Sequence, residues 1–376
     1  MTDHRRPQGL RRANTAAVLR AVLDTGPLPR ADLADRLGLA AGTVSRIVAP
    51  AVTAGLLREL PALSGGGGRP RVPVDLVRGA RYAVGLHLGR RRTTAGLVDL
   101  RGGVAAVRVH ERGPLEPAGL VAGAADVVRD LLKDAGDVPV LGIGAATVGW
   151  VDPGTGTVVD NEALGWHDVP LRALLTDATG LPTVVDSQAR AQATAELWFG
   201  DAHGDEAASV HLFTGNVIDA AFALGRRVHT GARSAAGRIG HLPVLDVRAA
   251  RDAPDGDSGG SSPACSCGRA GVLQAVATDL AVTAEAVRRG IVTPDADFTD
   301  VVAAALAGDG PADTLLRERA RYIGAAVAHL VDVFDPDTVV LSGGMLAVPA
   351  HLDEVRAEAV RRIGGGWDPE RVRLTT

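Results

Sequence analysis

The sequence predicts an α/β protein in which a small helical head precedes a larger body of alternating strands and helices. Three observations support this prediction: a basic N-terminal stretch, a helix–turn–helix spacing of apolar residues within it, and a strand-and-helix alternation that starts at Arg81. The 376 residues, 46% of them apolar, suffice for one large domain plus a small one, or for three small domains.

Charge is distributed unevenly along the chain. Residues 1–80 contain 12 arginines and six acidic residues, a net charge of +6, whereas the rest contains 28 basic and 38 acidic residues, a net charge of −10. A basic head on an acidic body indicates that the head meets a polyanion such as double-stranded DNA and that the body does not. A basic tail without a partner is the alternative.

Several classes of protein are excluded by composition. No apolar run reaches the roughly 18 residues that a membrane span needs, and residues 1–20 lack the apolar core of a signal peptide. The two cysteines, Cys265 and Cys267, lie two positions apart, which excludes a disulfide framework. We therefore expect a soluble, cytoplasmic protein that does not contact a membrane.

Residues 14–53 have the spacing of three helices. Apolar residues between Asn14 and Asp24 recur at helical intervals, the prolines of TGPLP then interrupt the chain, and RADLADRLGL predicts a second helix. Gly38 stands where a tight turn between helices needs a residue that tolerates positive φ. The next segment, AGTVSRIVAPAV, predicts a third helix with one apolar face made of Val44, Ile47, Val48 and Ala51.

The opposite, outward face of this third helix carries Thr43, Ser45 and Arg46. Two helices joined by a glycine turn, with small polar and basic residues facing out, are typical of a helix-turn-helix whose second helix enters the major groove. We expect Arg46 to reach a guanine edge or a phosphate. Pro50 removes a backbone hydrogen bond and predicts a kink or an early end of the helix.

The segment after Gly55, LLRELPALSGGGGRPRVPVDL, predicts two short strands around a glycine loop, which is the pattern of a wing. Arg69 and Arg71 flank Pro70 at its tip and suit a narrow minor groove. A GGGG tract alone is more often a flexible linker. Its position directly after a helix-turn-helix favours the wing.

The body begins with RYAVGLHLG, TTAGLVDLRG and AAVRVHE, which predict a three-stranded meander. An amphipathic helix over 118–135 and the buried strand VPVLGIGAATVG follow. Further on, a long helix over about 313–333 precedes VVLSGG, a strand that ends in a glycine turn. This order predicts an α/β body with a ligand cleft between lobes.

These strings resemble the ROK (repressor, ORF, kinase) family. The resemblance rests on the head and wing strings, on AVGLHLGRRRTTAGLVDLRG, VDPGTGTVVDNEALGWHDVPL, LPTVVDSQARAQATAELWFGDAHG, SAAGRIGH, CSCGRAGVL and FDPDTVVLSGG, and it covers about residues 11–345 in the expected order. It implies a winged helix-turn-helix over 1–78 and, over 79–376, a two-lobed actin-like ATPase fold. Kinases of the family bind a sugar and ATP in the cleft, and its repressors keep the sugar site.

The kinase chemistry of the family is not retained at the matching positions. The first phosphate loop of the kinases reads approximately DxGGTK, but here His87 replaces the metal-binding Asp and Arg90 replaces a glycine. The catalytic base, the Asp of an (E/D)NDAN string, corresponds to Gln188, and an amide accepts no proton at neutral pH. We therefore expect neither ATP and magnesium binding nor enzyme activity.

The sugar site implied by the resemblance has also changed. The Glu of GExGH corresponds to Arg238, and the Glu of CxCGxxGCxE corresponds to Gln274. The expected ligand-binding residues are Ser187, Gln188, Arg238, His241 and Gln274. Such a mildly cationic pocket suits a sugar phosphate or a sugar acid better than a neutral sugar. Alternatively, Arg238 turns outward and the cleft holds no ligand.

A structural zinc ion is implied by the family, which uses the histidine of GExGH and three cysteines. This chain keeps His241, Cys265 and Cys267 but has Val272 at the fourth position, and structural zinc sites are nearly always four-coordinate. The insert RDAPDGDSGGSSPA contains Asp252, Asp255 and Asp257, any of which can replace the missing ligand. Zinc binding and a pair of reduced thiols both remain open.

The expected function is a DNA-binding transcriptional regulator, most simply a repressor of carbohydrate genes, that senses a sugar or sugar derivative. A DNA-binding protein with a ligand-free dimerisation or docking body, and an active sugar kinase, are the alternatives. We expect a homodimer or a dimer of dimers, because paired heads bind palindromic sites. The sequence ends at RVRLTT, where the family continues with a helix, so the cleft closes differently or the first lobe exposes an apolar stripe.

Overall fold

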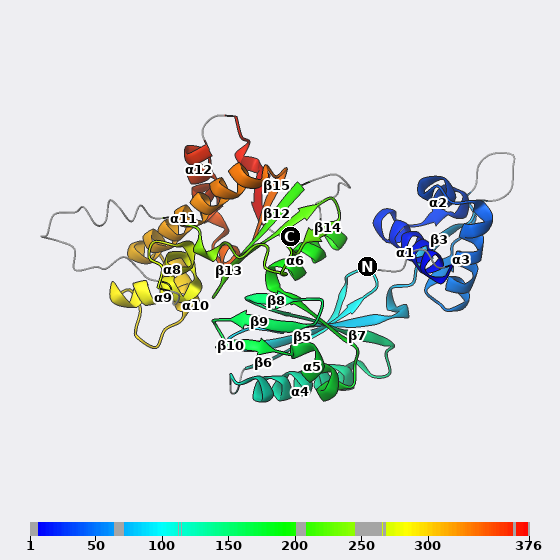
Figure 1. Cartoon of the computed structure of the whole chain (residues 1–376), viewed down its shortest axis with the longest axis horizontal. Coiled ribbons are helices and arrows are strands. Elements are labelled where there is room, and N and C mark those ends of the chain that lie inside the picture. Colours follow the sequence, from blue (N-terminus) through cyan, green and yellow to red (C-terminus); the bar gives the residue numbers. More distant parts are fainter. Residues whose placement is uncertain are drawn as a thin grey trace, which may run out of the picture.

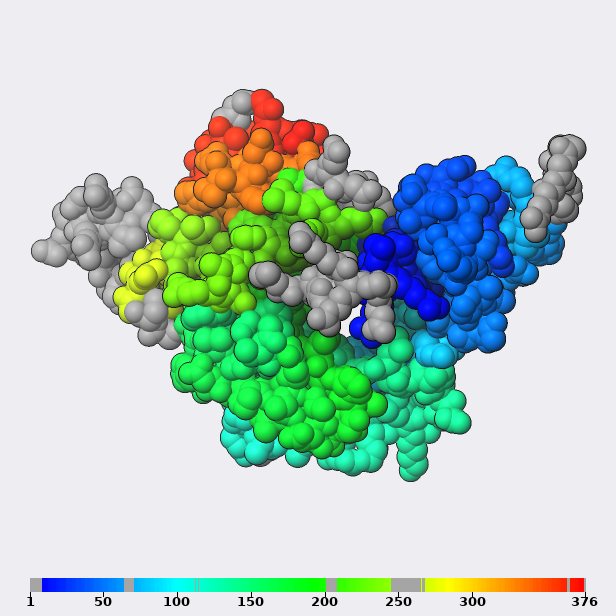
Figure 2. Space-filling model, turned by 45° about the vertical axis from the view of Figure 1, so that its right-hand side comes forward, coloured from blue at the N-terminus to red at the C-terminus, as the bar shows by residue number. Residues whose placement is uncertain are grey.

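The computed structural model describes residues 7–63, 71–111, 113, 115–200, 208–244, 265, 268–363 and 366–374. A small N-terminal head lies to one side of two larger lobes (Figure 1). The space-filling view shows the head as a separate mass packed alongside the body (Figure 2). None of the helices in these described ranges is long and apolar enough to cross a membrane.

The head has the helix order predicted for a winged helix-turn-helix. Its elements are α1 (Pro7–Thr25), β1 (Leu28–Pro29), α2 (Arg30–Leu37), α3 (Ala41–Thr53), β2 (Leu57–Glu59) and β3 (Pro73–Leu76). The three strands form an antiparallel sheet in the order β1–β3–β2. Gly38 ends α2 with φ at 61°, the left-handed conformation for which glycine carries no Cβ penalty.

The apolar face predicted for α3 forms the centre of the head. Its side chains are buried with those of α1, α2 and the wing strands in a single core that includes Val18, Val22, Leu33, Val44, Ile47, Val48, Ala51, Leu57 and Val74. Of the two outcomes predicted at Pro50, a kink or an early end, the early end does not occur, because α3 continues to Thr53. Pro50 is exposed, so water can satisfy the carbonyl that its missing N–H leaves unpaired.

The first lobe is built on a five-stranded sheet in the order β11–β7–β4–β5–β6. A short helix η1 (Arg78–Ala80) joins it to the head, and the predicted meander forms its antiparallel part. Helices α4 and α5 cover one face of the sheet and share its core. The elements are β4 (Tyr82–Leu88), β5 (Arg92–Asp99), β6 (Val104–Glu111), α4 (Pro117–Ala135), β7 (Val140–Thr147), α5 (Leu171–Thr179) and β11 (Thr183–Ser187).

The opposite face of this sheet presents exposed apolar side chains: Val107, Val109, Leu141 and Val184 are 45%, 48%, 57% and 65% exposed. A small three-stranded sheet extends the lobe toward the cleft, and it consists of β8 (Trp150–Asp152), β9 (Thr157–Asn161) and β10 (Trp166–Val169).

The second lobe repeats the plan with a five-stranded sheet in the order β14–β13–β12–β15–β16. Its strands are β12 (Ala208–Thr214), β13 (Ile218–Leu224), β14 (Arg227–His229), β15 (Thr338–Gly343) and β16 (Val372–Leu374). Its α-helices are α6 (Gln188–Phe199), α8 (Leu273–Ala277), α9 (Asp279–Arg288), α10 (Phe298–Leu306), α11 (Gly310–Phe334) and α12 (Leu352–Ile363). Short turns of 3₁₀-helix complete it: η2 (Ile239–His241), η3 (Gly344–Ala347), η4 (Pro349–His351) and η5 (Pro369–Arg371).

Two lobes with matching five-stranded sheets are the arrangement expected of the actin-like ATPase fold. The predicted strand VVLSGG is β15, and the long helix predicted before it is α11, which begins a little earlier than expected. The candidate ligand site lies where loops of the two lobes meet.

Candidate DNA-binding face and effector cleft

The candidate major-groove residues lie on the side of α3 that faces away from the core of the head. Thr43 and Ser45 are half-buried and Arg46 is exposed. The Arg46 side chain folds back on its own helix, donating from Nε to the Gly42 carbonyl and from Nη2 to Thr43 Oγ1, each at 3.3 Å. Both contacts are exposed, so the guanidinium can leave them for a base edge or a phosphate.

The wing residue Arg71 has a partner that the sequence did not reveal. Its guanidinium pairs with both carboxylate oxygens of Asp32, which lies in the first turn of α2. The two side chains are 55% and 36% exposed, so the pair is accessible to solvent and to a competing phosphate. Arg69, the other predicted wing contact, lies outside the described residues.

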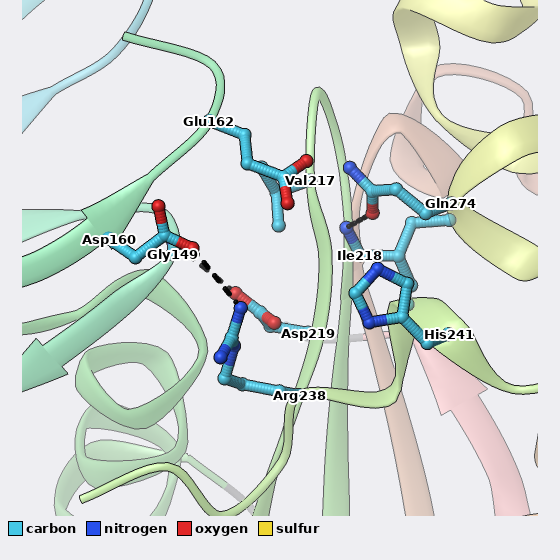
Figure 3. A pocket seen from close by; sticks show the side chains of 10 residues that line it. Gly149, Asp160, Glu162, Val217, Ile218, Asp219, Arg238, His241 and Gln274 are labelled. Carbon is cyan, nitrogen blue, oxygen red and sulfur yellow. Dashed lines mark hydrogen bonds and ion pairs between the residues drawn. The ribbon is translucent and has the colours of Figure 1, made fainter. Parts of the chain in front are cut away.

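A small pocket between the lobes brings together three of the five predicted ligand-binding residues: Arg238, His241 and Gln274 (Figure 3). Gly149, Asp160 and Glu162 line it from the first lobe, and Val217, Ile218, Asp219 and Gly240 complete it from the second. It is an open pocket with a cavity volume of about 30 Å³.

The other two predicted residues, Ser187 and Gln188, do not line this pocket. Ser187 is buried at the end of β11, and its hydroxyl caps α6 by accepting from the Arg190 N–H at 3.4 Å. Gln188 begins α6, and its Oε1 is buried with no hydrogen-bond partner among the described residues. The five predicted ligand-binding residues therefore divide into three that line the pocket and two that lie at the start of α6.

The expectation of a cationic pocket is wrong, because three carboxylates line the pocket together with the single guanidinium of Arg238. Its Nη2 donates to Asp160 Oδ2 at 3.2 Å across the cleft, and its guanidinium lies 5.2 Å from the ring centre of Trp150. Two more carboxylates, Glu162 and Asp219, face the same space (Figure 3). Arg238 neither turns fully outward nor stands ready for an anion. Instead it bridges the lobes.

Asp219 is the most unusual of these carboxylates. It projects from β13, is 8% exposed and accepts a hydrogen bond from the Gly149 N–H at 3.4 Å. Burial raises its pKa to about 6, although Gly149 and the nearby Arg238 and Arg190 favour the charged form. The sequence analysis did not predict Asp219; its signal in the sequence is an acidic residue at the start of a buried strand that follows the turn at Gly215.

Gln274 has a structural task in the pocket wall. Its Oε1 accepts from the Ile218 N–H at 3.0 Å, and its Nε2 donates to the Asn216 carbonyl at 3.4 Å (Figure 3). Both bonds fix the turn between β12 and β13. Gln274 therefore holds the loop that carries Asp219 and presents little of its amide to a ligand.

Two of the predicted zinc ligands lie side by side. His241 Nε2 and Cys265 Sγ are 3.7 Å apart, and two ligands of one tetrahedral zinc ion stand about 3.6 Å apart at ordinary bond lengths. Cys267 and the three aspartates of the insert lie outside the described residues. Val272 is buried and pairs with Pro243 as an isolated β-bridge, and the described residues contain no group of three or more metal-binding side chains.

A second, larger cavity of about 1,340 Å³ lies between the lobes. His87 and Arg90 line it, so the two departures from the phosphate loop face this space. Two carboxylates in its wall are engaged by arginines: Asp279 pairs with the buried Arg319, and Asp297 pairs with Arg91. A third carboxylate in the lining, Glu111, is exposed at the end of β6.

Comparison with known proteins decides the family. The ROK family model matches residues 83–374, and a winged helix-turn-helix DNA-binding model matches residues 11–58. The chain belongs to the ROK family. The transcriptional regulator Rv0485 of Mycobacterium tuberculosis is 34% identical in an alignment that covers 96% of this chain and 81% of that protein.

Three further comparisons cover most of the chain. The xylose repressor of Bacillus subtilis is 23% identical over 94% of this chain and 88% of its own length. A solved ROK family transcriptional regulator, a homologue of the E. coli MLC protein, shares the fold over 97% of this chain and 92% of its own, with a TM-score of 0.77 and 22% identity. A ROK glucokinase from Streptomyces griseus, solved with glucose and AMPPNP, has a TM-score of 0.67 and 25% identity over 78% of this chain and 94% of its own.

Proposed function

We propose that this protein is a transcriptional repressor that binds operator DNA through its head and releases it when a sugar-type ligand enters the cleft between its lobes. The observation that carries the proposal is full-length similarity, head included, to proteins named as transcriptional regulators and repressors. The exposed residues of α3 supply the chemistry for reading DNA. The regulated genes are then those of carbohydrate metabolism, and the protein acts in the cytoplasm.

The body serves this proposal as a sensor rather than as a kinase. Gln188 stands at the position of the catalytic base, and an amide cannot take the proton of an attacking hydroxyl at neutral pH. Two of the carboxylates that line the large cavity, Asp279 and Asp297, pair with arginines. In this proposal the cleft binds a ligand but does not convert it.

The preferred effector is a neutral, hydroxyl-rich sugar. Asp160, Glu162 and Asp219 accept hydrogen bonds from hydroxyl groups but repel a phosphate or a sugar carboxylate. Arg238 is already paired with Asp160, so an anion has to displace a carboxylate to reach it. D-Xylose is the first probe to test, since relatives are named for it.

The protein is further proposed to act as a homodimer or a dimer of dimers. A single winged head makes few base contacts, whereas two heads related by a two-fold axis read a palindromic site whose half-sites are spaced by helical turns. Light scattering at micromolar concentration tests this, and a monomer that binds operator DNA with full affinity contradicts it.

A zinc ion held by His241, Cys265 and Cys267 is the proposed cofactor. The 3.7 Å separation of His241 Nε2 and Cys265 Sγ supports a shared ion. Zinc would fix the loop that carries His241 at the pocket wall and would take no part in chemistry. Metal analysis of the purified protein should find one zinc per chain, and Cys265→Ser should lose it; metal-free wild type would overturn the proposal.

The central experiment selects genomic DNA fragments with the purified full-length protein. A recovered fragment should shift in gels with the wild type and should need a higher protein concentration to shift with Arg46→Ala. D-Xylose, D-glucose, glucose 6-phosphate and glucuronate are then added in turn. Release by a neutral sugar supports the proposal. If no sugar raises the melting temperature or alters DNA binding, the body is a ligand-free dimerisation or docking scaffold.

A further inference from the structure

We infer that α6 transmits the state of the cleft to the DNA-binding head, through a junction formed by Arg20 and Asp24 of the head with Leu197, Trp198 and Arg226 of the body. The inference rests on the proposed function, because it describes how an effector in the cleft would act on DNA binding. It concerns residues that neither touch DNA nor line the pocket between the lobes.

The last turn of α6 holds the first helix of the head. The Leu197 carbonyl accepts from Arg20 Nη2 at 3.4 Å and from Arg226 Nη2 at 3.2 Å. Asp24 Oδ1 accepts from the same two arginines, at 3.1 Å from Arg20 Nε and at 2.9 Å from Arg226 Nη2. Trp198 adds a cation–π contact, with the Arg20 guanidinium 3.6 Å from its ring centre.

This junction is more than a set of surface ion pairs. The side chains of Arg20, Asp24 and Arg226 are 20%, 15% and 28% exposed, so solvent screens them only partly. Leu197 lies among the last residues of α6, whose carbonyls carry the negative end of the helix dipole. Two guanidinium groups at a helix C-terminus are therefore favourably placed, and they tie α1 to α6.

The first turn of α6 lies at the boundary between the lobes. Arg190 is 3% exposed, and its Nη2 donates to the Val151 carbonyl of the first lobe at 2.6 Å. Its Nη1 donates to the Ser234 carbonyl of the second lobe at 3.1 Å. Ser234 Oγ in turn donates to Asp152 Oδ1 of the first lobe at 3.0 Å, in the loop that leads to Arg238.

Between its two ends α6 is fastened to the second lobe. Gln192 accepts from Ser342 Oγ of β15 at 2.7 Å, and Glu196 accepts from Arg373 of β16 at 2.8 Å. Its inner face packs through Ala189 and Ala193 against β13. A helix of 12 residues is about 18 Å long. It moves with the second lobe as one rigid element.

The head is also attached to the first lobe, which makes the junction sensitive to the angle between lobes. Arg101, in the turn between β5 and β6, pairs with the buried Asp75 of wing strand β3, and Leu100 packs against the core of the head. The head thus contacts the second lobe through Arg20 and Asp24 and the first lobe through Asp75. If the lobes part to admit a ligand, α1 and the wing cannot both keep their attachments, so the head must shift.

The test is a double-mutant cycle on the full-length protein and the DNA fragment recovered by selection. Ser234→Ala removes one bond between the lobes, and Arg226→Ala removes the two bonds that Arg226 donates to Asp24 and to the Leu197 carbonyl. Arg227→Ala, at the exposed neighbouring position, is the control with the same loss of charge. We expect Ser234→Ala to change the dissociation constant by about threefold or more in the wild-type and Arg227→Ala backgrounds. In the Arg226→Ala background the change should be clearly smaller, because only the Arg20 contacts then join α1 to α6.

Hydrogen exchange of α1 provides a second measurement that needs no DNA. Ser234→Ala should raise exchange in residues 18–25 more when Arg226 is present than when it is replaced by alanine. Equal effects of Ser234→Ala with and without Arg226, in both assays, overturn the inference. Should a sugar release DNA equally from wild type and Arg226→Ala, the proposed function stands and the coupling through α6 is refuted. Should no sugar act while the cycle shows coupling, the inference stands and the effector proposal fails.

Discussion

Asp219 provides a quantitative prediction about stability and pH. Burial is the main cause of its raised pKa, about 6 in the folded protein against an ordinary value of 3.8. The difference corresponds to about 3 kcal/mol of unfolding free energy, because each tenfold change in proton affinity is worth about 1.4 kcal/mol. Asp219→Asn removes this cost, and its amide oxygen can still accept from the Gly149 N–H.

The sign follows from proton binding. Between pH 3.8 and 6 the folded protein holds a proton on Asp219 that the unfolded chain has released, so wild-type stability falls as the pH rises through this window. Asp219→Asn should therefore be more stable than wild type by up to about 3 kcal/mol at pH 7.5 and by about half as much at pH 5.

Urea denaturation followed by circular dichroism at the two pH values measures the difference. Asp177→Asn, an exposed carboxylate on α5, is the control for loss of one negative charge and should show no such pH dependence. The reasoning is refuted if Asp219→Asn is no more stable than wild type at pH 7.5, or if its advantage is the same at pH 5.

Three further predictions concern the head and the cleft. Arg46→Ala should weaken binding to the selected fragment by about 1–3 kcal/mol and relax sequence preference at one base position, as measured by gel shift with mutated sites; unchanged affinity would exclude a base contact. Arg71→Ala should weaken binding to all DNA sequences and flatten the salt dependence of the affinity. Asp32→Asn frees Arg71 from its partner and should strengthen binding to unrelated DNA at low salt. Identical salt slopes for the wild type and these two variants would contradict both expectations. The wild type should hydrolyse no ATP above background in the presence of D-xylose or D-glucose, because Gln188 replaces the base, and turnover that disappears on substitution of Gln188 would reverse that conclusion.

Local features of the sequence determined the elements of the head and much of the body. The apolar spacing in α3 and the glycine at position 38 specify a buried face and a left-handed turn through short-range geometry alone, and the structure has both. Pro50 marks the limit of such reasoning. A proline predicts a break in a helix, but the surrounding core and an accessible carbonyl let α3 continue.

The sequence by itself, through its resemblance to the family, predicted that the chain lacks the kinase base, because an amide stands at position 188. Only the tertiary structure decided the charge of the pocket, because Asp160 and Asp219 come from strands of different lobes and meet Arg238 only when the lobes close. It likewise paired Arg71 with Asp32 and set the last turn of α6 against α1. The charge of a side chain and the helical spacing of apolar residues can be read from single residues and short segments. The hydrogen-bond or ion-pair partner of a side chain in a distant segment depends on how those segments pack.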